Sequence, residues 1–574
     1  MRPEPVSQSA PVPTLRSDAQ ALVSPATVRV PPSRAERLRA LASQTFDVLV
    51  IGGGVTGCGI ARDAALRGLS VALIEREDFA SGTSSRSSRL IHGGVRYLEH
   101  GHLGLVFESS IERARLLRLA PHLVRPLSFV WPVYRGARIA RWKLAAGLML
   151  YDALALFRNV KASRRLSARA LLQAVPGIRT EGLRGGSRYY DAATDDARLT
   201  LANAIGASEA GALVLNHASV QGLLLEEGKA RGATVVDALS GEHLSVRARV
   251  LVNATGPWSD EIRRLDTQDT QPAVRGSKGV HIAVPRERLS VDTALTLLST
   301  VDGRVMFIIP ADTHTIIGTT ETATHAHPAE VRASQGDVDY LLTSANGFFP
   351  QAHLTRGDVV SAWAGIRPLA ASAYSGGGDA NSASREHSIH LSPSGVLAIS
   401  GGKLTTYRVM ARDVVDAAEK ALGVPHRKET THVLPLPGGD MLALDAELAA
   451  ARAEVAREDT AVHLVRAYGS RWRRVWALTH ERAELAEPLV PGLPYVRAEA
   501  VYGVTYEFVH TLADLLIRRL KVAFETRDLG RAAARVAAAD MAPLLGWSPE
   551  SIPQQLADYG RHAERLFGID AAEA

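Results

Sequence analysis

The chain has 574 residues, more than one ordinary hydrophobic core accommodates, so we expect two or three domains. The single cysteine, Cys58, excludes an internal disulfide and any multi-cysteine metal or iron–sulfur site, and we expect no metal. The net charge of +6 would suit anionic lipid, nucleic acid or an anionic substrate, but no nucleic-acid-binding motif is present, so no nucleic-acid partner is expected. No stretch of about 18 or more residues is both apolar and uncharged, so the sequence predicts no membrane-spanning helix.

Residues 1–44 are predicted to form a disordered leader. They are rich in Pro, Ser, Ala and Arg, include the pair Pro31-Pro32, and show no steady hydrophobic period. They also lack the apolar core of a secretion signal, and their many prolines disfavour an organelle transit peptide.

A dinucleotide-binding unit is predicted to follow directly. Residues 46–51 form the continuous apolar run of a buried parallel strand and lead into a GGGVTG turn at 52–57. A helix to about Arg67, a second strand over 69–74 and the acid Glu75 complete the pattern. Because all five parts occur in order, the signal is much stronger than an isolated glycine motif.

Each glycine of the turn has its own physical task. Gly52 permits the tight turn, Gly54 lets the backbone approach a pyrophosphate, and Gly57 allows the helix to pack closely on the strand. The helix N-terminus offers N–H groups and a positive dipole end to that anion. Glu75 lies 23 residues after Gly52, where a carboxylate can accept hydrogen bonds from ribose hydroxyls.

Three later segments favour FAD over NAD as the dinucleotide. Residues 81–98 follow the second strand and are rich in hydroxyls, while 250–258 and 397–406 are apolar strands that end in glycine or small polar residues. Such endings let the backbone approach a flat ring or a phosphate. A fold that meets its ligand with several separated stretches suits an extended cofactor such as FAD, and a second Gly-x-Gly-x-x-Gly motif is absent.

Residues 138–157 have two possible roles. Arg138, Arg141, Trp142 and Lys143 precede an apolar run that begins at Leu144. This pattern fits a helix lying at a membrane interface with Trp142 as an anchor, and it also fits a buried helix of the substrate domain with a basic start.

The predicted fold class is α/β with an added helical domain. We expect an FAD-binding Rossmann-like domain over 45–434, interleaved with an inserted mixed-sheet substrate (cap) domain. Residues 435–439 are typical of a linker, and helical spacing from about Ala443 predicts a C-terminal all-α domain over 435–574.

Several motifs together resemble the FAD-dependent, respiratory (aerobic-type) glycerol-3-phosphate dehydrogenases. The resemblance covers about residues 46 to 565, and its most selective parts are IHGGVRYLE at 91–99 and GGKLTTY at 401–407. The other matching segments are the glycine turn, 84–90, 253–258, 276–281, 317–321, 365–369 and 514–519.

The resemblance implies oxidation of sn-glycerol 3-phosphate to dihydroxyacetone phosphate with FAD as hydride acceptor and a membrane quinone as the next acceptor. It implies a protein bound peripherally to the cytoplasmic face of the inner membrane, and it is compatible with a homodimer. The leader departs from the family's compact start.

Candidate catalytic residues follow from the same motifs. Arg96, Arg367 and Tyr97 are placed at the substrate site, where arginine forks suit a phosphate dianion. His281 is the candidate base, or polariser of the substrate oxygen, and His92 is the rival base; we expect a base poised near neutrality. The structural alternatives are a surface ion pair for either arginine and a core histidine for His281.

The remaining candidates concern the flavin. Lys403 would stabilise the anionic reduced ring, unless it is a salt-bridged structural lysine, and Thr320 would help to hold substrate or flavin. The cofactor-binding candidates are Gly52, Gly54, Gly57, Glu75, Thr83, Ser84, Ser88, Arg89, Gly93, Ala254, Gly256, Gly402, Leu404 and Thr405.

Three rival functions share part of this pattern. A glycerol-3-phosphate oxidase would pass its electrons to oxygen. In an amino-acid oxidase of the glycine-oxidase kind, Arg96 and Arg367 would clamp a carboxylate instead of a phosphate. A flavin-binding sensor would have no turnover, and the presence of His281 and Lys403 argues against it.

Overall fold

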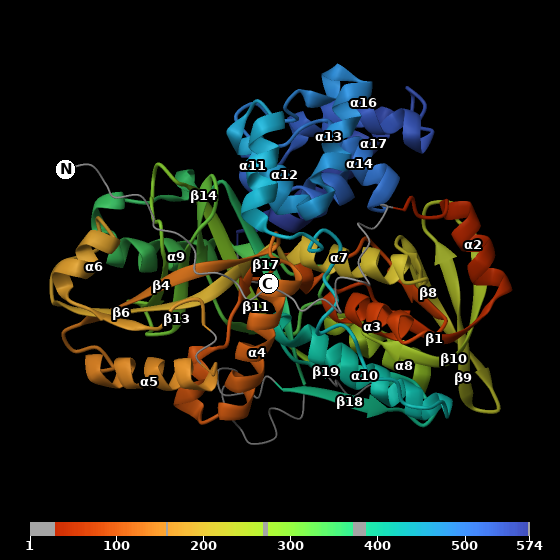
Figure 1. Ribbon diagram of the computed structural model, residues 1–574, viewed down its shortest axis with the longest axis horizontal. Helices are drawn as coiled ribbons and strands as arrows, with labels where there is room; N and C mark the ends of the chain where they lie inside the picture. The colour runs from red at the N-terminus through yellow and green to blue at the C-terminus, as the bar shows by residue number, and fades with distance from the viewer. Residues whose placement is uncertain (1–28, 157–158, 268–273, 371–385, 572–574) are drawn as a thin grey trace.

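The computed structural model describes residues 29–156, 159–267, 274–370 and 386–571, which form two large sheets and a helical domain (Figure 1). A small third sheet pairs β16 (Ala333–Ser334) with β20 (Ile569–Asp570). The helical domain lies above both large sheets in this view and is formed by the C-terminal part of the chain. Among the described residues, none of the helices combines the length and the apolar character needed to cross a membrane.

The first sheet contains the predicted dinucleotide unit. Its central strands run parallel, with Val50 beside Val252 on one side and beside Leu73 on the other. Helix α3 (Val55–Leu66) packs against α7 (Asp196–Glu209) and α10 (Tyr407–Leu422), and these helices share an apolar core with the sheet. The strand order is β18 (His387–Leu391), β19 (Leu397–Gly401), β10 (His243–Asn253), β1 (Thr45–Ile51), β2 (Val71–Ile74) and β7 (Leu213–Leu215), with β8 (Ala218–Glu226) and β9 (Lys229–Asp237) joined at β10.

The second sheet is mixed and carries the substrate side of the molecule. All of its strand pairs are antiparallel except one: β12 (Ala294–Leu298) runs parallel to β4 (Val124–Tyr134). Helix α9 (Gln335–Phe348) covers it and shares its core. The order is β15 (Thr322–Thr324), β11 (Val274–Pro285), β14 (His314–Gly318), β13 (Val305–Pro310), β12 (Ala294–Leu298), β4 (Val124–Tyr134), β6 (Leu183–Thr194) and β3 (Leu90–Ile91); β17 (Ser361–Ala370) also pairs with β11, and β5 (Arg164–Leu166) with β6.

The C-terminal helical domain is joined to this framework by apolar packing. Buried side chains from its later part, including Phe524, belong to one core cluster with residues of the second sheet such as Trp363. Most buried side chains of its first helices form a separate cluster. Its elements are α11 (Leu444–Glu454), α12 (Glu458–Tyr468), α13 (Trp472–Glu481), α14 (Ala498–Tyr506), a π-helical turn (Asp514–Arg519), α15 (Val522–Glu525), α16 (Arg531–Leu545) and α17 (Ile552–Phe567).

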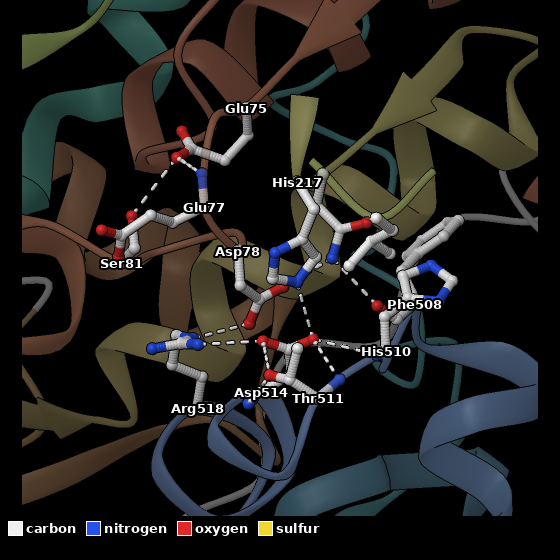
Figure 2. A network of polar contacts seen from close by, with 12 residues as sticks. Glu75, Glu77, Asp78, Ser81, His217, Phe508, His510, Thr511, Asp514 and Arg518 are labelled. Atoms are coloured by element: carbon white, nitrogen blue, oxygen red, sulfur yellow. Dashed lines mark hydrogen bonds and ion pairs between the residues drawn. The ribbon is translucent and has the colours of Figure 1, made fainter. Parts of the chain in front are cut away.

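A buried polar network also connects the helical domain to the segment after β2 (Figure 2). Asp78 accepts hydrogen bonds from Arg518 Nε at 2.7 Å and from Arg519 Nη1 at 2.6 Å. Asp514 accepts from Arg518 Nη2 at 2.9 Å and lies 2.9 Å from Nε2 of His217. Although burial opposes a charge on His217, Asp514 outweighs it and raises the pKa of the imidazole. These charges compensate one another in a site that excludes water, so removing one partner would leave a buried charge unpaired.

The predicted leader is partly wrong, because residues Arg34–Ser43 form helix α2. The Ser33 and Glu36 side chains form a reciprocal capping box at its start, and Leu38 and Leu41 are buried against the first sheet. The proline-rich composition before Ser33 concealed this short amphipathic signal. Residues 1–28 of the predicted leader lie outside the described residues.

The segment predicted to be interfacial or buried forms helix α5 (Arg141–Leu154), which is buried on one face. Leu144, Leu148 and Tyr151 are buried. On the opposite side Trp142 is 64% exposed and Met149 is 66% exposed. The helix therefore covers the core with one face and presents large apolar side chains to the outside with the other.

Candidate active site

A cavity of about 550 Å³ opens where both sheets and the helical domain meet. Its walls include the glycine turn after β1, the ends of β10 and β19, and residues of β11 and β17. Arg565 of α17 also contributes to the wall. The site therefore lies at the carboxyl ends of the parallel strands, the usual place for a ligand in an open α/β sheet.

The glycine turn has the geometry expected of a pyrophosphate cradle. A Cβ at Gly52, whose φ is +108°, would lie 2.7 Å from the carbonyl oxygen of Ala254, and one at Gly57 would lie 1.9 Å from that of Gly52. These two glycines are therefore required by the turn itself. At Gly54 the nearest atom to such a Cβ is Ser84 Oγ at 3.4 Å, so this position is open toward the cavity. The turn leaves room for a phosphate group at Gly54.

Glu75, the acid predicted to bind the adenosine half of the cofactor, lines the cavity, and its carboxylate holds the protein backbone. It accepts hydrogen bonds from the Gly53 N–H at 2.6 Å and the Glu77 N–H at 2.9 Å. Burial outweighs these bonds and raises its pKa. Two oxygens with several lone pairs can hold the turn and still accept from a ribose hydroxyl.

Two arginines at this end, Arg76 and Arg565, were not predicted from sequence. The Arg76 guanidinium lies 4.8 Å from the Trp258 ring and pairs with Glu261. Arg565 pairs with Glu77 at 3.1 Å, and both line the cavity. Arg565 is far away in sequence and carries no motif, whereas Arg76 directly follows the recognised acid and could have been singled out.

His281 of β11 faces the cavity from the substrate side. Its Nε2 lies 2.8 Å from Ser88 Oγ, and its ring stacks on Trp363 of β17 with centroids 5.5 Å apart. Burial, together with the charges of Arg367 and Arg89, lowers the pKa of His281 to about 3. The expectation of a base poised near neutrality does not hold for the substrate-free site. The imidazole is neutral and able to accept a proton, and an arriving dianion would offset the nearby positive charge.

Arg367 of β17 lies on the neighbouring strand and also lines the cavity. Its Nη2 donates to Thr319 Oγ1 at 3.2 Å, and its Nη1 lies 3.5 Å from Ser277 Oγ. A Cβ at Gly279 would lie 2.7 Å from Nη2, so the glycine leaves the space that the guanidinium occupies. An arginine held in this way offers a fixed positive fork to an anion.

Lys403, Tyr97 and His92 line the same cavity. The Lys403 ammonium lies 3.8 Å from the centroid of the Tyr97 ring and 3.3 Å from Ser109 Oγ. Its cation–π contact holds its positive charge near the cavity.

Some predicted residues lie beside the cavity instead of in its wall. Thr320 uses its hydroxyl to accept the Val280 N–H, and Thr405 accepts the His92 N–H, so both support the local backbone. Gly93 donates to Tyr151 at 2.8 Å. Arg89 packs behind the site, and Arg86 lines the cavity in its place. The side chain of Arg96, in the 3-10 helix η2 (Val95–His100), is not among the described ones.

The other cofactor candidates lie in the cavity wall. They are Gly52, Gly54, Glu75, Thr83, Ser84, Ser88, Ala254, Gly256, Gly402 and Leu404. They come from segments that are far apart in sequence, as expected for one long ligand.

Comparison with known proteins identifies the family. Residues 47–408 match the family model of FAD dependent oxidoreductases, and residues 429–552 match the C-terminal domain of alpha-glycerophosphate oxidase. Glycerol-3-phosphate dehydrogenase of Mycobacterium leprae is 41% identical over 547 residues, covering 94% of this chain and 92% of the relative. The chain belongs to the FAD-dependent glycerol-3-phosphate dehydrogenase family.

Other relatives agree with this assignment. The Synechocystis glycerol-3-phosphate dehydrogenase is 38% identical and is matched over 97% of its length, covering 92% of this chain. The glycerol-3-phosphate dehydrogenase structure from Bacillus halodurans, complexed with FAD, is 33% identical with a TM-score of 0.77, and covers 93% of this chain and 97% of that one. FAD is therefore the cofactor, and the cradle at Gly54 fits its pyrophosphate.

A shorter solved structure shares part of the fold. L-alpha-Glycerophosphate Oxidase from Mycoplasma pneumoniae matches with a TM-score of 0.52 at 17% identity, so it shows the fold alone. It is covered over 98% of its length but covers only 68% of this chain.

Proposed function

We propose that the protein oxidises sn-glycerol 3-phosphate to dihydroxyacetone phosphate, and that a membrane quinone accepts the electrons. The observation that carries the proposal is the placement of Arg367 and His281 on paired strands in one cavity with the glycine turn. The names of the relatives support glycerol 3-phosphate as the substrate.

The side chains divide the chemistry among them. FAD supplies the hydride acceptor when it is bound. Arg367 binds the phosphate dianion, and neutral His281 accepts the proton of the secondary hydroxyl through the edge that contacts Ser88. The positive charge of Lys403 lies near the cavity, where it would stabilise negative charge that develops during the reaction.

Glycerol 3-phosphate added without oxygen is expected to reduce the flavin and so bleach its absorbance. In the Arg367→Ala variant, a higher concentration of glycerol 3-phosphate should be needed for the same bleaching. Losing a charged hydrogen-bond partner costs about 1.5–3 kcal/mol, or roughly 10- to 150-fold in affinity. The Michaelis constant for glycerol, which has no phosphate, should change far less. Stopped-flow absorbance with both substrates measures this difference.

Arg356→Ala is the matched control, because Arg356 is an exposed arginine paired with Asp339 outside the cavity. Equal losses on glycerol and glycerol 3-phosphate would give Arg367 a structural role. Bleaching by glycine instead of glycerol 3-phosphate would favour the amino-acid oxidase.

Exposed apolar side chains support a quinone as the electron acceptor, because a quinone is reached at the bilayer. Besides Trp142 and Met149 of α5, the neighbouring helix α4 (Leu103–Leu119) exposes Leu103 and Phe107, which are 45% and 42% exposed. The basic residues Arg138, Arg141 and Lys143 stand at the start of α5. Apolar side chains beside basic ones are typical of a surface that docks on anionic lipid. We place this surface on the cytoplasmic face of the inner membrane.

The protein is expected to bind anionic liposomes more tightly than neutral ones, with only part released by high salt. Each well-placed basic residue contributes about 1 kcal/mol to the free energy of binding anionic lipid, and salt screens this attraction. Salt does not screen the contribution from apolar side chains that become buried in the bilayer. Trp142→Glu with Met149→Glu should abolish co-sedimentation at high salt.

Val301→Glu serves as the control, because Val301 is 55% exposed on the turn between β12 and β13. Failure to bind either liposome, together with oxygen reduction at full rate, would defeat the quinone proposal and favour the oxidase.

A further inference from the structure

We propose that the C-terminal helical domain positions the candidate base, with Phe524 holding Trp363 and, through it, the imidazole of His281. The inference rests on the proposed role of His281 in catalysis. Phe524 and Trp363 touch neither substrate nor flavin in this scheme, so they are positioning residues.

A continuous row of aromatic rings connects the helical domain to the cavity. His281 and Trp363 face each other across β11 and β17, and their rings are nearly parallel at 12°. Phe524 of α15 meets Trp363 edge to face at 5.1 Å, and Phe567 of α17 meets Phe524 at 4.8 Å. All four side chains are buried. The only part of this row that reaches the cavity is His281.

Two polar contacts fix Phe524 to this position. The Ser361 hydroxyl, also in β17, donates to the Phe524 carbonyl oxygen at 2.7 Å. The Arg89 guanidinium lies 4.5 Å from the Phe524 ring and 5.3 Å from the Trp363 ring, so it contacts both. Phe524 is therefore held against the strand that carries Trp363, and the stack cannot shift without moving α15.

The side of the imidazole that faces away from Ser88 is buried. Within the described parts of the chain, neither Nδ1 of His281 nor Nε1 of Trp363 has a hydrogen-bond partner, and both atoms are buried. The ring is thus oriented by stacking and by the single contact of Nε2 with Ser88. Packing can orient the ring only while the side chains behind Trp363 stay in place. These side chains are Phe524 and Phe567 of the helical domain.

The packing of Phe524 and Trp363 behind His281 also keeps the imidazole neutral. Burial is the main cause of the low pKa of His281, which is about 3. Truncating Phe524 would open a space behind Trp363, admit water and relax the stack. The pKa of His281 would then rise toward its ordinary value, so the protonated and inactive fraction would increase at acidic pH.

The test is the pH dependence of anaerobic flavin reduction by glycerol 3-phosphate, measured as kcat/KM for Phe524→Ala, Phe524→Leu and wild type. The ratio of variant to wild type at each pH cancels the ionisation of the substrate phosphate. Because the wild-type pKa of His281 is about 3, we expect the acid limb of Phe524→Ala to be displaced upward by roughly two pH units, so that this ratio falls below about pH 6. For Phe524→Leu the displacement should be smaller, and the ratio should fall only at lower pH.

Phe348→Ala is the matched control, because Phe348 is a buried phenylalanine of α9 that packs on Tyr134, away from the cavity. A ratio that is lowered equally at all pH values in flavin-loaded Phe524→Ala would overturn the inference. If Phe524→Ala fails to fold, the same comparison is made with Phe524→Leu. Full flavin reduction by His281→Ala would instead refute the proposed base, which separates the two failures.

Discussion

His281→Ala is expected to slow anaerobic flavin reduction by about 10²- to 10⁴-fold, the usual contribution of a positioned acid or base. The flavin should remain bound, because His281 lies on β11 whereas the glycine turn follows β1. Wild-type kcat/KM should show no acid limb from this group between about pH 5 and 8, because its pKa in the free protein is about 3. Stopped-flow absorbance across this range measures both effects.

His314→Ala is a suitable control. His314 is also buried, with a pKa lowered mainly by burial, but it lies in β14 outside the cavity wall. His92→Ala tests the rival base directly. A larger loss with His92→Ala than with His281→Ala would transfer the role of base to His92.

Gly54→Val is expected to give a folded protein without flavin. The open side of Gly54 faces the cavity, so a valine side chain would occupy the space that the pyrophosphate requires, while its backbone conformation suits any residue. The flavin absorbance of the purified protein should be almost absent, and circular dichroism should be unchanged. By contrast, Gly57→Val should prevent folding, because a Cβ there collides with the Gly52 carbonyl oxygen.

Gly357→Val provides the control for Gly54→Val. Gly357 is exposed in a short 3-10 turn, and a Cβ there would approach no atom more closely than 3.6 Å. A full flavin complement in Gly54→Val would show that the pyrophosphate does not pass this position.

The sequence contained most of the cofactor side of the site. Strand, glycine turn, helix and acid are consecutive from Thr45 to Glu75, so local pattern was sufficient to place them. The helical C-terminal domain was also predictable, because its apolar residues recur at helical spacing. The family motifs located His281 and Arg367, although they could not say which atoms these residues would contact.

The remaining features depend on contacts between distant segments. The stack of His281 on Trp363 follows from the register of β11 and β17, which no local pattern reveals. Arg565 reaches the cavity only because α17 packs beside the segment after β2. The hydrogen bond that the Thr320 hydroxyl accepts from the Val280 N–H likewise depends on a segment distant in sequence.

Because of the network at Asp78, we expect the cofactor to bind only near the end of the synthesis of the chain. Asp78 and Arg518 are 440 residues apart in sequence but form a direct hydrogen bond. At a ribosomal speed of about 5–20 residues per second, roughly 20–90 s separate the synthesis of these two partners. Until then the buried carboxylate lacks its counter-charges, and the loop that carries Glu75 cannot adopt its final form. Incomplete nascent chains should therefore bind flavin poorly. We expect flavin to bind only after nearly the whole polypeptide has been synthesised.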